Sequence, residues 1–398
     1  NADFIVDMGP YAGQFGGEIM FAGTKDALLK ANTLTANYLS GKIKIPIPKM
    51  RKKWNNFIAV TGAKEHNLKL EKQTIKFPLD VFTVITGVSG SGKSTLLNNV
   101  FYAALMNYFG TPLSYAGKYA KISGDLNLIK HVEYIDQKPI GKSSRSNPAT
   151  YIKAWDDIRL LFASQKAARF NRLKPAHFSF NVEGGRCETC KGDGIIKIDM
   201  QFMADIYLVC DACEGKRFKN NILEISYRGK NIFDILEMTI AEAIIFFNED
   251  TENKIAGNIV RKLKYLELVG LDYLHMGQSS AILSGGESQR IKLAFFLSRE
   301  NNEHTIFLFD EPTTGLHFYD IGKLLKAFGK LIEKGNTVMV IEHNPEIIVQ
   351  ADWIIDLGPD GGNNGGEVVF QGEPEDIIKC KKSYTGKYLK DFLKKYRY

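Results

Sequence analysis

The stretch Val81-Phe-Thr-Val-Ile-Thr-Gly-Val-Ser-Gly-Ser-Gly-Lys-Ser94 indicates the class of fold that this chain adopts. Its apolar first half predicts a strand, and the run from Leu96 to Tyr108 predicts the helix that follows. A glycine-rich turn between a strand and a helix points backbone N–H groups at a phosphate, and the helix N-terminus adds a favourable partial charge. Lys93 should reach the β- and γ-phosphates of a nucleoside triphosphate, and the hydroxyl of Ser94 should ligate Mg²⁺. The predicted phosphate-binding residues are Gly87, Ser89, Gly90, Ser91, Gly92, Lys93, Ser94 and Thr95.

A pair of carboxylates follows a second apolar run, Thr305–Phe309, further along the chain. In a phosphate-loop ATPase, Asp310 would hold Mg²⁺ and Glu311 would polarise the attacking water. The alternative is a solvated turn without a catalytic role. Gln137 also ends a predicted strand and could sense the metal or the water. His343 follows another such strand and could hydrogen-bond a γ-phosphate, although a single histidine in this position is more often structural.

A second anion site is predicted at Leu283-Ser-Gly-Gly-Glu287. Two glycines precede a predicted helix there, and a serine adds a hydroxyl donor. A second motif of this kind, distant in sequence from the first, indicates that ATP is held between two domains. A lone domain could then not close its own site, so we expect a dimer of such domains. The residues predicted for this half-site are Ser284, Gly285, Gly286 and Glu287, and together with the phosphate loop they resemble the ABC ATPases.

Four of the five cysteines form two C-x-x-C pairs, Cys187/Cys190 and Cys210/Cys213. Four thiolates in two such pairs fit a tetrahedral Zn²⁺ site, and four ligands leave no open coordination position, so the metal should be structural. Unligated or redox-active cysteines are the alternative. The pairs are similar to the zinc repeats of DnaJ chaperones, but two pairs are too few for that class. Cys380 has no neighbour of its kind in the sequence and is expected to be a free thiol.

An internal repeat indicates the domain organisation. Ala2–Pro10 returns as Ala351–Pro359, and Gly16–Ile19 returns as Gly365–Val368 in the same register. We therefore expect the chain to be the second half of a tandem protein; a short duplication without a missing partner is the alternative. The predicted fold is α/β, an ABC-type P-loop ATPase core with an inserted helical signature domain that contains a four-cysteine zinc module. The predicted parts are 1–45 (tail of a preceding ATPase domain), 46–56 (basic linker), 57–142 (first part of the core), 143–281 (signature domain, with the zinc module at about 178–219) and 282–398 (signature motif and the rest of the core).

Composition and charge narrow the class of protein further. No apolar run approaches the ~20 residues needed to cross a bilayer, and no basic stretch leads into an apolar one near residue 1. We therefore expect no membrane contact. The paired cysteines suit a reduced cytosol with a metal better than a secreted disulfide framework, so we expect a cytoplasmic protein. The net charge of +7 and the pI near 8.9 fit a polyanionic partner and an incidental excess equally well.

Basic residues gather around the cysteine pairs, which makes duplex DNA a plausible partner because phosphate contacts need only such charges. For any one of these residues, a solvated surface is the alternative. The residues are Lys138, Lys142, Arg145, Lys166, Arg169, Arg172, Lys174, Arg186, Lys191, Lys216, Arg217 and Lys219.

The combination of an ABC core, cysteine pairs before the signature motif and a repeated tail resembles the UvrA family. The resemblance covers essentially the whole chain, aligned with the C-terminal half of the family. It implies a damage-recognition ATPase of nucleotide excision repair, which belongs to an excinuclease system without being a nuclease itself. It also implies the cofactors ATP, Mg²⁺ and Zn²⁺, a DNA-binding dimer, and the loading of UvrB through the missing first half. The matching motifs include Gly62–Leu68, Arg145–Tyr151, Phe178–Val182, Thr313–His317 and Ile341–Asn344.

Three other functions stay open on the sequence alone. One is a UvrA-like paralogue that gives drug tolerance or self-protection. Another is a transporter-type ABC ATPase subunit, which would have no use for a zinc insertion. The third is a scaffold with weak catalysis, because an isolated half lacks its complementary half-sites.

Overall fold

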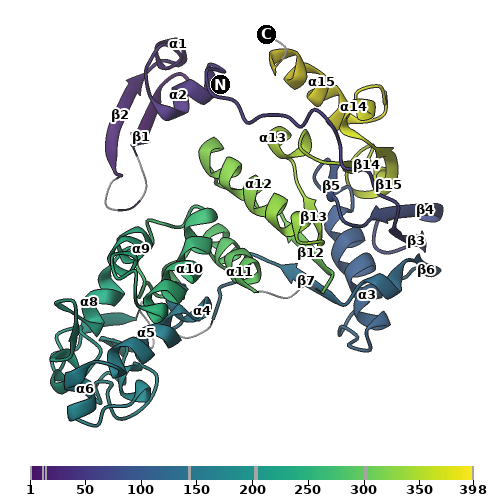
Figure 1. Cartoon of the computed structure of the whole chain (residues 1–398). Coiled ribbons are helices and arrows are strands. Elements are labelled where there is room, and N and C mark those ends of the chain that lie inside the picture. Colours follow the sequence, from purple (N-terminus) through teal and green to yellow (C-terminus); the bar gives the residue numbers. More distant parts are fainter. Residues whose placement is uncertain are drawn as a thin grey trace. The chain divides into compact units, whose positions relative to one another are not determined.

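The computed structural model describes residues 2–10, 13, 16–141, 145–200, 205–299 and 303–396. Lys142, one of the basic residues named above, lies outside these ranges. The chain divides into two compact units: Asn1–Pro10, Gly16–Gln137 and Glu300–Tyr398 form the core unit, and Tyr11–Phe15 and Lys138–Arg299 form the helical unit (Figure 1).

The core unit contains the phosphate loop and most of the β-structure. Its six-stranded sheet has the order β15-β14-β5-β13-β12-β7, and all neighbours are parallel except β14 and β15. A three-stranded antiparallel sheet has the order β4-β3-β6, and β1 and β2 form a two-stranded antiparallel sheet. The strands are β1 Ile5–Gly9, β2 Glu18–Gly23, β3 Phe57–Ala63, β4 Leu70–Pro78, β5 Phe82–Gly87, β6 Lys121–Gly124, β7 His131–Ile135, β12 Thr305–Asp310, β13 Thr337–Ile341, β14 Trp353–Gly358 and β15 Glu367–Gly372.

The helix after the phosphate loop extends over Thr95–Tyr108, as the sequence predicts, but its first part, Thr95–Tyr102, is a π-helix. The expected basic linker, 46–56, contains neither helix nor strand. Its Arg51 forms an ion pair with Glu375 and its Lys53 one with Glu373, so part of the linker's charge is paired within the core unit. The helices are α1 Lys25–Leu28, α2 Leu34–Leu39, α3 Ala103–Tyr108, α12 Phe318–Glu333, α13 Pro345–Ile348, α14 Pro374–Ile377 and α15 Tyr384–Tyr396, with 3₁₀ turns at Leu126–Leu128 and Gly362–Asn364.

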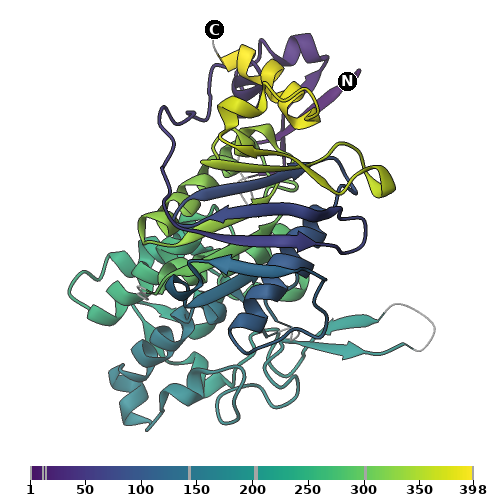
Figure 2. The same cartoon turned by 90° about the vertical axis from the view of Figure 1, so that its right-hand side faces the viewer.

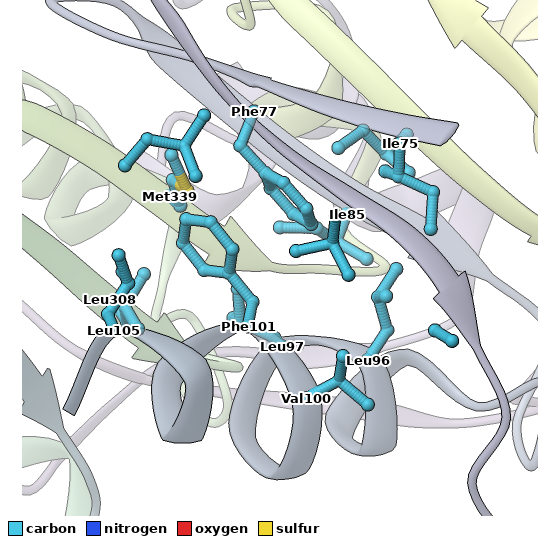
Figure 3. Packing of buried hydrophobic residues seen from close by; sticks show 14 of the residues in the cluster. Ile75, Phe77, Ile85, Leu96, Leu97, Val100, Phe101, Leu105, Leu308 and Met339 are labelled. Atoms are coloured by element: carbon cyan, nitrogen blue, oxygen red, sulfur yellow. The ribbon is translucent and has the colours of Figure 1, made fainter. Parts of the chain in front are cut away.

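Burial of the Thr95–Tyr108 helix between the two sheets of the core unit fixes the position of the phosphate loop. Its apolar side chains pack against β4, β5, β12 and β13, as Figure 3 shows for Phe101, Leu97 and their neighbours. The rings of Phe77 and Phe101 stack at 4.0 Å between centroids. Strand β5 is buried along its whole length, which is typical of a parallel strand covered on both faces. The loop that leaves β5 is therefore held from both ends.

The helical unit is built largely from short helices. The stretch from Pro148 to Phe170 forms three helices and not one, because Lys153 adopts a left-handed φ of 60° and Gln165 is extended. The helices are α4 Pro148–Tyr151, α5 Ala154–Ala163, α6 Lys166–Phe170, α7 Asn220–Leu223, α8 Ile232–Glu237, α9 Ile240–Asn248, α10 Lys254–Leu268 and α11 Gly285–Ser298, with 3₁₀ turns at Pro175–Phe178 and Ser280–Ile282 and the short strands β8 Ile195–Ile198, β9 Ile206–Val209, β10 Ser226–Tyr227 and β11 Lys230–Asn231.

Two features of the helical unit were not expected from the sequence. Helix α11, whose first turn contains Gly285–Glu287 of the second anion motif, groups with this unit because it packs on α10 and α4. Strands β8 and β9, which lie between the two cysteine pairs in the sequence, form an antiparallel hairpin that extends from the rest of the unit (Figure 2). Among the described residues, no helix combines the length and the apolar character that a membrane crossing requires.

Candidate functional site

The phosphate loop begins where β5 passes β14. A Cβ atom on Gly87 would lie 2.1 Å from the carbonyl oxygen of Leu357, and Gly87 has a φ of 134°, so only glycine fits there. The Lys93 ammonium donates to the carbonyl oxygens of Gly87 and Val88, at 3.0 and 2.8 Å. Burial lowers the pKa of Lys93, while the carboxylates of Glu311, Asp356 and Asp310 oppose that shift. A largely buried ammonium at the start of a helix provides a site for phosphate.

The four residues predicted to be catalytic lie together at the ends of β7, β12 and β13. Glu311 has a φ of 44°, and its carboxylate Oε1 lies 3.6 Å from Nε2 of His343. The side-chain amide of Gln137 donates to the backbone carbonyl of Glu311 at 3.4 Å. Tyr134 donates its phenol proton to Asp310 at 3.2 Å. The structure thus brings Gln137, Asp310, Glu311 and His343 into one cluster of the core unit.

The electrostatics of this cluster suit a bound divalent cation. Burial raises the pKa of Asp310, the neighbouring Glu311 carboxylate raises it further, and the Tyr134 hydrogen bond lowers it. A cation beside Asp310 would offset both the burial and the repulsion between the two carboxylates. Burial and the nearby Lys93 charge lower the pKa of His343, so its neutral imidazole is the favoured form at neutral pH.

Two buried carboxylates near this cluster were not predicted from the sequence. Glu342 accepts hydrogen bonds from the backbone N–H and hydroxyl of Thr313 and from the N–H groups of His343 and Asn344. Asp356 accepts from the hydroxyls of Thr86, Ser383 and Thr385. Each stands inside or directly after a run of buried apolar residues. An acidic residue in such a run is the sequence signal that could have identified them.

The second anion motif forms the N-terminus of α11 in the helical unit. The Ser284 hydroxyl accepts from the N–H of Glu287 at 3.2 Å, and the Glu287 carboxylate accepts from the N–H of Ser284 at 2.8 Å. Tyr273 donates to the same carboxylate. Glu287 therefore has a capping role at this helix end, while Ser284, Gly285 and Gly286 begin the helix. This motif and the phosphate loop belong to different compact units.

The four paired cysteines converge on one point of the helical unit. Their sulfur atoms all lie within 4.8 Å of one another, with 3.9 Å between Cys187 and Cys210 and 3.7 Å between Cys190 and Cys213. A tetrahedral zinc site with Zn–S bonds of about 2.3 Å places its sulfurs about 3.8 Å apart, whereas a disulfide needs about 2.05 Å. The cluster is therefore compatible with a tetrathiolate zinc site. The N–H of Gly194 donates to the Cys190 sulfur at 3.2 Å, a partner that suits a ligating thiolate.

The basic residues around the cysteines differ in their burial and in the ion pairs that they form. Arg145 forms an ion pair with Asp193 at 3.1 Å, and Arg186, Lys216 and Lys219 pair with neighbouring glutamates. Arg217 is largely buried against the Phe180 ring, and burial lowers the pKa of its guanidinium, so it does not belong to an open surface. The exposed members of the set are Lys138, Lys166, Arg169, Arg172, Lys174 and Lys191, of which Lys166, Arg169, Arg172 and Lys174 lie on or shortly after α6.

The comparisons with known proteins agree on one family. No family model matches the chain. It is 51% identical over 394 residues to the UvrABC system protein A of Clostridium perfringens and 50% identical over 397 residues to that of Aquifex aeolicus. These matches cover 98% and 99% of this chain but only 41% and 42% of the relatives.

A solved structure gives the same result. The crystal structure of UvrA2 from Deinococcus radiodurans matches 98% of this chain, and 46% of the matched chain, with a TM-score of 0.89 and 40% identity. The chain thus spans about two fifths of the length of the curated relatives that it matches. Because sequence and structure agree over nearly every residue, the chain belongs to the UvrA family.

Proposed function

We propose that this chain binds and hydrolyses ATP and uses the ATP state to control its binding to duplex DNA, as part of a DNA-repair protein that recognises damage. The observation that carries this proposal is the single cluster of Lys93, Asp310, Glu311 and His343 in a chain homologous to UvrABC system protein A. ATP hydrolysis needs a lysine that binds phosphate, carboxylates that hold Mg²⁺ and activate water, and a hydrogen-bond donor for the γ-phosphate, and this cluster contains a group for each.

Each residue of the cluster has a proposed role. Lys93 and the N–H groups of Gly87–Thr95 bind the phosphates, and Ser94 and Asp310 would hold Mg²⁺, which neutralises phosphate charge when it is bound. Glu311 orients the attacking water and takes its proton. His343, held neutral, donates a hydrogen bond toward the γ-phosphate, and Gln137 joins this region to the chain that leads into the helical unit.

The second anion motif has its own proposed role. We assign Ser284, Gly285 and Gly286 to closing the nucleotide site of another ATPase domain, because they expose a helix N-terminus with a hydroxyl beside it. We therefore propose a dimer of ABC domains, in which one domain provides the phosphate loop of a nucleotide site and the other provides the second anion motif. We assign the contact with UvrB to the part of the curated relatives that this chain does not span.

The repeat detected in the sequence is also a structural repeat, which supports the proposed domain division. Thr35 donates to Asp7 at 2.7 Å as Thr385 donates to Asp356 at 2.9 Å. Both antiparallel strand pairs, β1–β2 and β14–β15, carry a register shift directly after this aspartate. Strand β14 also pairs with β5, whereas among the described residues β1 pairs with β2 alone.

The two copies of the sequence repeat, near residues 2–23 and 351–372, differ in how far their apolar side chains are exposed. Val6, Met8 and Ile19 of the first copy are 51–68% exposed, whereas Ile355 and Leu357 of the second are buried. A hairpin with this much exposed apolar surface fits the edge of a further sheet. We therefore propose that residues 2–45 complete another ATPase domain, as 351–396 complete this one.

The proposed DNA-binding surface is the basic end of α6. Lys166, Arg169, Arg172 and Lys174 are exposed there, and Phe170, 89% exposed, stands among them. Phosphate contacts bind without reading sequence, and an exposed aromatic ring can stack on an unpaired base. This combination suits a protein that detects distorted duplexes by their backbone and by weakened stacking.

Removal of two charges from this surface should weaken DNA binding in a salt-dependent way. In R169A/R172A, we expect the slope of log K against log salt to fall in magnitude by about 0.9 for each phosphate that the variant no longer neutralises. Fluorescence anisotropy with a labelled duplex at several salt concentrations measures the slope. The matched control is K326A/K330A, which removes the same charge from exposed positions of α12. Equal slopes for both variants would exclude the α6 surface.

DNA-stimulated ATP hydrolysis tests the proposed function as a whole. We expect the steady-state hydrolysis rate of the chain to change when duplex DNA is added, and to lose this response in R169A/R172A. A transporter-type ATPase would hydrolyse ATP without any response to DNA. Hydrolysis that is indifferent to DNA would therefore contradict the proposal.

A further inference from the structure

We propose that Glu342 is a positioning residue that locks the Glu311 turn to the His343 loop and so sets the distance between these two groups. Its consequence for ATP hydrolysis rests on the proposed function. The lock itself can be tested without any nucleotide.

The lock consists of hydrogen bonds that use both oxygens of one buried carboxylate. Oε1 accepts from the backbone N–H of Thr313 at 2.9 Å and from its hydroxyl at 2.7 Å. Oε2 accepts from the N–H of His343 at 3.0 Å and from that of Asn344 at 3.2 Å. The Glu342 residue is only 3% exposed. Glu342 thus joins two loops that are separated by 29 positions in the sequence.

These loops carry the two groups that face each other in the cluster. Thr313 lies in the turn that Glu311 begins, because the N–H of Thr314 donates to the Glu311 carbonyl at 3.2 Å. The N–H of Glu311 is itself held by the carbonyl of Ile341, the residue before Glu342. His343 is the residue after it. The lock therefore holds the backbone on both sides of the 3.6 Å contact between the Glu311 carboxylate and the His343 imidazole.

The donors require a carboxylate at this position. All but the Thr313 hydroxyl are backbone N–H groups, which cannot reverse their direction, so a neutral amide would place its own NH₂ group against at least one of them. The other buried carboxylate, Asp356, differs in this respect. Its donors are the hydroxyls of Thr86, Ser383 and Thr385, which can rotate and accept a hydrogen bond from an amide. Glu342 is thus the carboxylate of the pair that an amide cannot replace.

The test compares E342Q with the wild-type chain and with D356N, its matched control. Hydrogen–deuterium exchange without nucleotide should show weaker protection in peptides covering 311–316 and 342–346 for E342Q, and unchanged protection there for D356N. With ATP, kcat should fall by about a hundredfold, the cost of an approximately 1 Å misplacement, while the Kd for ATP stays within about threefold of wild type.

Two further variants keep the test decisive. T313V removes the hydroxyl donor to Glu342 and leaves Glu342 in place. We therefore expect smaller losses of exchange protection and of kcat than in E342Q. T313S keeps the hydroxyl and should have wild-type values. In the E311Q background, E342Q should lower kcat little further, because both changes remove the same arrangement. Unchanged exchange at 311–316 in E342Q would overturn the lock. Equal losses in kcat and ATP affinity would overturn the positioning role. If the wild-type chain did not hydrolyse ATP, the proposed function would be contradicted. The hydrogen–deuterium exchange result would then still test whether Glu342 joins the two loops.

Discussion

Glu311→Gln should leave ATP binding intact and lower the rate of hydrolysis by at least about a hundredfold, the usual contribution of a general base. The carboxylate stands beside Asp310, Lys93 and His343, and it lies outside the phosphate-binding loop. Glutamine keeps the shape of the side chain but cannot take a proton from water. A nucleotide-binding titration measured together with steady-state phosphate release separates the two effects.

E333Q is the matched control for this variant, because it makes the same chemical change at an exposed position of α12. It should hydrolyse ATP at the wild-type rate. Turnover by E311Q that stayed close to that of E333Q would show that Glu311 is not the base. Loss of ATP binding together with turnover would instead assign Glu311 a role in holding the nucleotide.

Cys187→Ser should abolish stoichiometric zinc binding and loosen the segment at about 178–219. In this segment the four cysteines form a buried cluster of their own, and β8 and β9 expose their side chains. A structural zinc site contributes about 10–16 kcal/mol of apparent binding free energy in zinc-finger peptides, so removal of one thiolate affects the whole segment. Zinc content by mass spectrometry and limited proteolysis of the segment measure both effects.

C380S provides the control, since Cys380 lies in the core unit, where it is half-buried and its thiol donates to the Val369 carbonyl at 3.6 Å. Its zinc content should match that of the wild type. ATP binding should survive in both variants, because the phosphate loop belongs to the core unit and the zinc cluster to the helical unit, while C187S should lose DNA affinity. A zinc content unchanged by C187S would refute the four-thiolate site.

The sequence predicted those parts of the molecule whose signals are local. The apolar run before Gly87 and the helix after Ser94 are where the pattern placed them, because a phosphate loop requires that context within a few residues. The cysteine pairs likewise converge as their spacing predicted. The fold class was confirmed by the match to a UvrA structure.

Contacts between distant segments could not be predicted in this way. The bond between Thr313 and Glu342 links two strand ends, and no periodicity along the chain encodes it. The ion pair of Arg145 with Asp193 and the burial of Arg217 could not be predicted either. Counting charges along the sequence had placed both arginines on an open basic surface. The left-handed backbone of Lys153, with a φ of 60°, could not be predicted from residue type, because glycine, and less often asparagine or aspartate, are the residues that favour this conformation.

Control of DNA binding by ATP can be measured by an anisotropy titration of intact and damaged duplexes at two salt concentrations. The titration would use the hydrolysis-deficient E311Q chain with and without ATP. We expect affinity that falls steeply with salt, as backbone contacts require, and a preference for the damaged duplex that changes when ATP is added. Affinity that is the same with and without ATP, for both duplexes and at both salt concentrations, would contradict the proposed coupling.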